Sequence, residues 1–128
     1  MKPVHWVAST LKDLKAFPEA VRQEVGFSLH LAQQGGKAVN SVPMVGFHGA
    51  KVLEVVIDEQ GNTFRAVYTV KFTKAVYVLH AFQKKSKKGI ATPKPDIDLI
   101  NTRLKAAEDH YKQTYSVKAK QERSHGGA

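Results

Sequence analysis

Apolar residues in the first third of the chain recur at intervals of three and four, the spacing of one helix face. The repeating positions are Leu11, Leu14 and Phe17, followed by Val21, Val25, Leu29 and Ala32. Pro18 divides the two sets, and proline suits the first turn of a helix better than its interior. Gly35 and Gly36 can adopt the left-handed conformation that commonly ends a helix. Residues 10–34 are therefore predicted to form a helical hairpin.

The apolar period shortens to two residues after position 50, which is the alternation of β-strands. A turn cluster at residues 58–62 and a polar break at residues 73–74 divide this region into three strands. Turns this short join antiparallel neighbours. Residues 51–83 are therefore predicted to be a three-stranded antiparallel meander. Residues 4–8 are predicted to form a further short strand, and residues 35–50 a loop.

The last periodic segment follows Pro93 and Pro95, where a helix can begin. Its apolar stripe consists of Ile97, Ile100, Leu104, Ala107 and Tyr111. The predicted order is β-α-α-β-β-β-α, an α+β fold with a small antiparallel sheet, the helical hairpin packed on one face and a C-terminal helix. We expect one domain over residues 1–115 and a basic, disordered tail over residues 116–128.

The charge of the chain indicates a class of partner. It has 20 Lys and Arg residues against 11 Asp and Glu residues, a net charge of +9. Residues 84–128 alone contain 11 basic and 5 acidic residues. A concentration of this kind is typical of proteins that bind a polyanion such as nucleic acid. A solvated basic surface or a mobile tail accounts for the charge equally well.

The composition excludes several classes of chemistry. The chain has no cysteine, which excludes disulfides, thiolate catalysis and cysteine-ligated zinc. Its six histidines are scattered without the spacing of a metal site, so we expect neither a metal nor a cofactor. No apolar run is long enough to span a membrane, and the first residues lack the apolar stretch of a secretory signal. We therefore expect a cytoplasmic protein without a membrane partner.

Three segments together carry a family resemblance. They are Thr63-Phe64-Arg65-Ala66-Val67-Tyr68, then Val76-Tyr77-Val78-Leu79-His80-Ala81-Phe82-Gln83-Lys84-Lys85, then a proline-opened helix with Ile97, Ile100 and Arg103. Over residues 4–112 the chain resembles the RelE/HigB toxin superfamily, in its phage-derived HigB-like branch. The resemblance implies the toxin of a type II toxin–antitoxin system, a ribosome-dependent messenger RNA endoribonuclease. It also implies a cognate antitoxin, expected to be a helix-turn-helix protein, that neutralises the toxin.

One strand departs from the pattern of the superfamily. Many members have an arginine or lysine in the strand that corresponds to residues 52–57, where this chain has only Glu54. Lys51, at the start of that strand, could compensate. A noncatalytic, basic nucleic-acid-binding module of phage origin is the alternative function.

Metal-independent RNA cleavage uses the 2′-hydroxyl as the nucleophile on the adjacent phosphate, so cations and a proton-transfer group must meet there. Arg65 is the candidate for charge stabilisation, since it lies within a strand and can grip two phosphate oxygens. The residues that alternate with it along the strand, on the same face, are predicted to face the nucleic acid. The alternative for Arg65 is an exposed arginine with a structural role. Lys84 and Lys85 point to opposite sides of an extended strand, so one of them should face the surface of Arg65. Crowding by other cations would lower the pKa of that lysine and favour proton transfer.

The remaining candidates are assigned by charge and residue type. Those expected to contact RNA or the ribosome are Lys51, Lys71, Lys87, Lys88 and Arg103. A basic turn without a specific role is the alternative for the loop that holds Lys87 and Lys88. His80 is a candidate for proton transfer, although a packed, hydrogen-bonded histidine is the favoured interpretation.

Overall fold

The computed structural model describes residues 1–47, 49, 51–84 and 92–116. Along the chain the elements are β1 (Val4–Trp6), α1 (Thr10–Lys15), α2 (Glu19–Gln33), β2 (Ser41–Pro43), β3 (Val52–Glu59), β4 (Asn62–Thr69), β5 (Val76–Lys84) and α3 (Lys94–Tyr115). The α+β class, the helical hairpin, the meander and the C-terminal helix are confirmed. None of the helices in the described part of the chain is long and apolar enough to cross a membrane.

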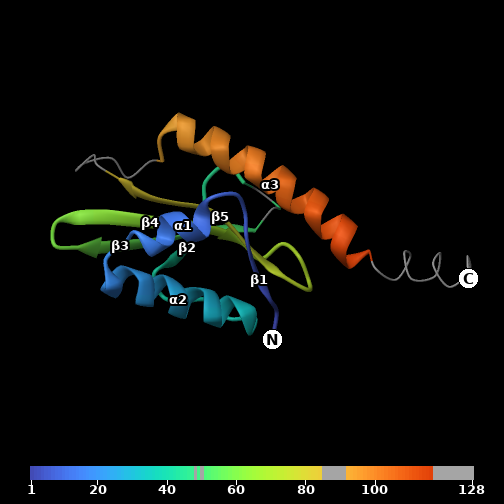
Figure 1. The fold of residues 1–128 in the computed structure, drawn as a ribbon, viewed down its shortest axis with the longest axis horizontal. Helices are drawn as coiled ribbons and strands as arrows, with labels where there is room; N and C mark the ends of the chain where they lie inside the picture. The colour runs from blue at the N-terminus through green and yellow to red at the C-terminus, as the bar shows by residue number, and fades with distance from the viewer. Residues whose placement is uncertain (48, 50, 85–91, 117–128) are drawn as a thin grey trace, which may run out of the picture.

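The strands form one five-stranded sheet in the order β1-β5-β4-β3-β2. Helices α1 and α2 cover one face and α3 covers the other (Figure 1). The meander β3-β4-β5 is antiparallel, and its first turn has positive φ at Gln60 and Gly61, which is typical of two-residue hairpin turns. The fold is therefore a sheet between two helical layers.

Two expectations about the sheet were wrong. It is mixed, because β1 pairs with β5 in parallel, and three residues are too few for an alternation pattern to indicate a direction. Strand β2 lies inside the expected loop, where it pairs with β3 through Ser41, Val42 and Pro43. Proline is tolerated there because β2 is an edge strand.

The two faces of β4 are both buried. Phe64, Ala66 and Tyr68 pack against α1 and α2, as predicted for the apolar row. Val67 of the other row belongs to the same buried cluster as Ile100 and Leu104 of α3. The prediction that the row of Arg65 lies on an open face is therefore wrong, because the apolar stripe of α3 packs there.

A β-bulge in β5 changes which residues share the α3 side. Val67 pairs with His80 whereas Tyr68 pairs with Val78, so Leu79 is an extra residue opposite β4. Before the bulge the odd-numbered residues of β5, such as Tyr77, face α3. From His80 onward the even-numbered residues do so. As a result His80, Phe82 and Lys84 lie on the same side as Arg65.

Candidate functional site

The centre of the candidate site is a buried ion pair between two neighbouring strands. Nη1 of Arg65 on β4 donates a hydrogen bond to Oε1 of Glu54 on β3, 2.9 Å away. Arg65 is 5% exposed and Glu54 is 7% exposed. Arg65 is therefore neither an exposed structural arginine nor a side chain displayed on an open sheet. The acidic residue that departs from the superfamily pattern is its partner.

Residue Thr92, which precedes α3, fixes the other carboxylate oxygen of Glu54. Its hydroxyl donates a hydrogen bond to Oε2, 3.0 Å away. Nε of Arg65 is buried and has no hydrogen-bond partner among the described residues. Buried donors are rarely left unpaired, so this N–H adds a desolvation cost to the site.

The side chain of Lys84, at the end of β5, lies near this pair. The residue is 7% exposed, and burial together with the positive charge of Arg65 lowers the pKa of its amine, while Glu54 acts in the opposite direction. Arg65 and Lys84 thus place two cations beside one carboxylate in a site of low dielectric, where charge acts strongly. We call Glu54, Arg65, Lys84 and Thr92 the charged cluster.

His80 has a packed position between β5 and α3. Its Nε2 donates to Oδ1 of Asp96 at 2.7 Å, and its Nδ1 lies 3.5 Å from Nη1 of Arg103. The ring stacks on Phe82 with centroids 4.4 Å apart. Both ring nitrogens have partners, which agrees with the favoured interpretation of a hydrogen-bonded histidine rather than a proton-transfer group.

Of the three candidates for RNA contact that the structure describes, two are held by contacts within the protein. Arg103 is half-buried and donates to the carbonyl oxygen of Leu79, so it anchors α3 to β5. Lys71 pairs with Glu108 of α3, and Lys51 is exposed with positive φ just before β3. The strand register places Lys51 and Lys71 near Thr69, whereas Lys84 pairs opposite Thr63 at the other end of β4. Lys51 therefore does not supply the missing strand cation.

Three further candidates, Lys85, Lys87 and Lys88, lie outside the described residues.

The charged cluster also contains Thr92, which no motif in the sequence indicated. Thirty-eight positions separate Thr92 from Glu54, and no sequence spacing could have connected them. Asp96 was missed for the same reason, since its partner His80 is on another element.

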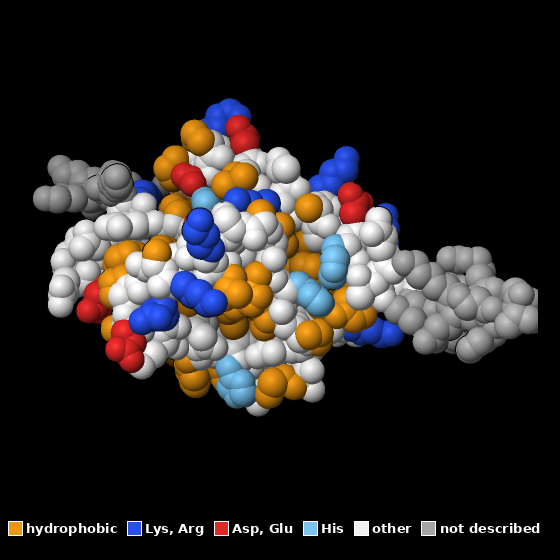
Figure 2. Space-filling view, viewed as in Figure 1, with side chains coloured by type: hydrophobic (Ala, Val, Ile, Leu, Met, Phe, Trp, Pro, Cys, Tyr) orange, Lys and Arg blue, Asp and Glu red, His pale blue; other side chains and the backbone are white. Residues whose placement is uncertain are grey.

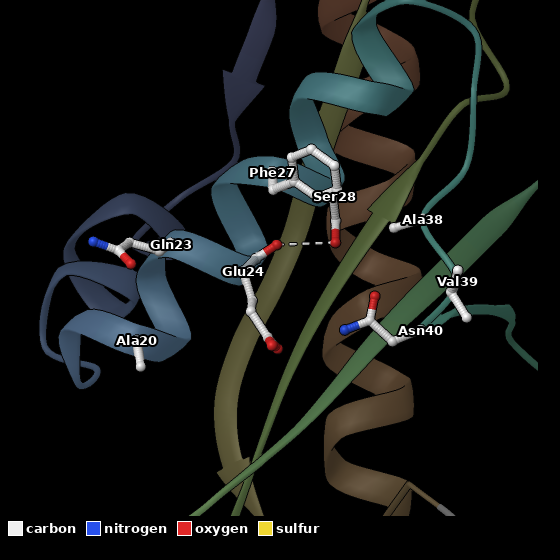
Figure 3. Close-up of a pocket in the computed structure, with 8 residues that line it drawn as sticks. All are labelled: Ala20, Gln23, Glu24, Phe27, Ser28, Ala38, Val39 and Asn40. Atoms are coloured by element: carbon white, nitrogen blue, oxygen red, sulfur yellow. Dashed lines mark hydrogen bonds between the residues drawn. The ribbon is translucent and has the colours of Figure 1, made fainter.

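On the described surface, cations for a phosphate gather neither on the face that carries α1 nor in the hollow beside α2. Lys and Arg side chains on the face that carries α1 are scattered among apolar and acidic ones (Figure 2). A hollow of about 530 Å³ lies between α2 and the segment that leads into β2 (Figure 3). Glu24 is the one charged side chain among its described lining residues, so a phosphate would meet no cation there.

Comparison with known proteins identifies a family. A family model described as "Phage derived protein Gp49-like (DUF891)" matches residues 12–105. This span includes the charged cluster, His80 and Arg103, and it excludes β1 and the end of α3. No curated protein and no solved structure matches the chain. The chain therefore belongs to the Gp49-like family of phage-derived proteins, a family of toxin-like modules of the RelE type.

Proposed function

We propose that this protein is the toxin of a type II toxin–antitoxin system, in the HigB-like branch, and that it cleaves messenger RNA on the ribosome. The observation that carries the proposal is the burial of Arg65 and Lys84 beside the single carboxylate of Glu54. The cluster keeps a net charge of +1 when all three groups are ionised. Membership of a toxin-like family supports the proposal.

In the proposed reaction the 2′-oxygen of RNA forms a bond to phosphorus and the bond from phosphorus to the 5′-oxygen breaks. The products are a 2′,3′-cyclic phosphate and a 5′-hydroxyl end. Arg65 stabilises the negative charge that builds up on the phosphorane, as fixed cations do in dry sites. The 2′-hydroxyl loses its proton as it attacks, and the leaving 5′-oxygen must gain one. Lys84 accepts the first and supplies the second, and the lowered pKa of its amine favours this exchange.

The partners in this proposal follow from charge. Lys85, Lys87 and Lys88 contact the RNA or ribosomal backbone, and the antitoxin is a helix-turn-helix protein encoded beside the toxin. Such contacts hold the toxin in place on the ribosome and contribute little to the choice of sequence. The reaction takes place in the cytoplasm, where translating ribosomes are found.

A second candidate is a noncatalytic nucleic-acid-binding module. The observation that favours it is the ion pair itself, because Nη1 of Arg65 is already bonded to Glu54. In that case Arg65 would be a structural residue, and the basic segments would bind nucleic acid without cleaving it.

Induced expression followed by primer extension on cellular transcripts distinguishes the two functions. We expect growth arrest and new transcript ends with the wild-type protein. We expect neither with Lys84→Gln, and both with the matched control Lys105→Gln, since Lys105 is exposed on α3. Wild-type expression without new transcript ends would favour the noncatalytic module.

A further inference from the structure

An apolar cleft opens beside the charged cluster. Its volume is about 500 Å³, and the edge strand β2 with the residues after it forms one wall while the first turn of α3 forms the other. The apolar lining residues are Val42, Pro43, Met44, Val45 and Ile97. Val42 pairs directly with Glu54 in the β2–β3 register, so the two side chains lie next to each other. The cleft thus joins an apolar surface to the carboxylate of the cluster.

The polar side chains that the described residues contribute to the cleft present hydrogen-bond acceptors. Glu54 and Thr92 are its polar side chains among the described residues. The hydroxyl hydrogen of Thr92 is used in the bond to Glu54, so its oxygen is left as an acceptor. A carboxylate has about four acceptor positions, and Arg65 and Thr92 each take one. A ligand that binds these two side chains must therefore supply donors.

We propose that the cleft binds a guanine base of the RNA strand whose phosphate lies at Arg65 and Lys84. This inference rests on the proposed function, and it assigns the base that the site prefers. Guanine has two adjacent donors, N1–H and the N2 amino group, on one edge. The other RNA bases place an acceptor beside their donor on that edge, and this acceptor would face the carboxylate.

Charge favours a neutral donor in the cleft over a cationic one. An arginine side chain of a partner protein also has paired donors, but the cluster already contains Arg65 and Lys84 against one carboxylate. A further cation would be repelled. A guanine base adds no charge, and the apolar walls formed by Val42, Met44 and Ile97 are suited to its flat, poorly hydrated faces. Bidentate base contacts of this kind discriminate by roughly tenfold to a hundredfold.

The experiment measures binding of the four nucleoside 3′-monophosphates to the purified protein by calorimetry. We expect guanosine 3′-monophosphate to bind at least about tenfold more tightly than the other three. Val42→Trp fills the cleft from an edge-strand position that is 45% exposed, so the fold should tolerate it. It should abolish this preference and leave the binding of inorganic phosphate unchanged. The matched control is Val39→Trp, at a fully exposed position outside the cleft, and it should keep the preference.

The outcomes separate this inference from the proposed function. Equal affinity for the four nucleotides would overturn the guanine site, even if primer extension shows RNA cleavage. A guanosine preference that disappears in Val42→Trp supports the site, even if no cleavage is found and the catalytic proposal fails. Arginine amide that competes as strongly as guanosine 3′-monophosphate would assign the cleft to a protein side chain and overturn the proposal.

Discussion

Arg65 and Glu54 form an ion pair with 2.9 Å between Nη1 and Oε1, and both side chains are buried. Removing a charge from water is costly, and the attraction between two buried charges roughly offsets that cost. The charge of each side chain therefore offsets the desolvation cost of the other. Arg65→Ala alone cannot separate a catalytic role from a structural one, since it leaves Glu54 buried without its partner.

The first prediction concerns the stability of this pair. Glu54→Leu should lower the free energy of unfolding by about 3–5 kcal/mol, because it leaves Arg65 and Lys84 as buried cations without a carboxylate. Arg65→Met should cost less, because Lys84 remains beside Glu54. The double variant should lose less than the sum of the two single losses, because Arg65→Met then removes a cation that has no carboxylate partner. Urea unfolding of the three variants measures the coupling between the two side chains. The exposed pair Lys94–Asp98 is the control, and Lys94→Ala should cost less than about 1 kcal/mol. Additive losses at Arg65 and Glu54 would contradict the buried-pair account.

The second prediction follows from the lowered pKa of Lys84. Between that pKa and the ordinary value of 10.5 the unfolded chain binds more protons than the folded one, so stability should rise with pH across this window. Urea unfolding at several pH values below 10 should show this rise. Lys84→Met should lose it, and Lys105→Met should keep it. A slope that is the same in all three proteins would show that Lys84 is not the titrating group.

The third prediction concerns mild acid and the contact between β1 and α3. Nε2 of His5 is 2.6 Å from the hydroxyl oxygen of Tyr115, and burial and the nearby His110 lower the pKa of His5. As pH falls from 6.5 through that lowered pKa, the unfolded chain takes up the proton first and stability is lost. Thermal unfolding at pH 7.5 and pH 5 should therefore show a smaller acid-induced drop for His5→Phe. His30→Phe, at an exposed position of α2, should behave like the wild type, and an equal drop in all three would rule out His5 as the cause.

The fourth prediction concerns Lys87 and Lys88, in the basic segment between β5 and α3. Each lysine that binds a phosphate contributes about one to the slope of log binding constant against log salt concentration, so neutralising both to Gln should make the slope shallower by about two. Cut-site preference should not change, because phosphate contacts carry no sequence information. Filter binding to RNA over a salt series measures the slope. If the slope of the double variant equals that of the wild type, these lysines do not bind the backbone.

Periodicity was sufficient to predict the helical hairpin, the meander and α3, because each has several apolar residues in a regular repeat. It missed β2, whose three residues pair through their backbones and have no alternation. It also misplaced Arg65. The sequence shows that α3 has an apolar stripe, but it does not show that this stripe packs on the side of Val67 and Arg65.

The site could be predicted in part. A cation on the middle strand and a dilysine after the last strand indicated Arg65 and Lys84, which the structure brings together. Their connection to Glu54 and Thr92 depends on contacts between elements far apart in sequence. Such contacts leave no local pattern in a single sequence.

The bulge at Leu79 determines whether an amine or an amide stands beside Arg65. If the pairing of Tyr68 with Val78 continued along β5 without a step, Gln83 would lie opposite Thr63. The one-residue shift places Lys84 there instead, on the side of Arg65. Regular pairing of the same β5 sequence would therefore leave the sheet paired but replace a cation of the charged cluster by a neutral side chain. The second positive charge of the cluster thus depends on an irregularity of the backbone as well as on the presence of a lysine in the sequence.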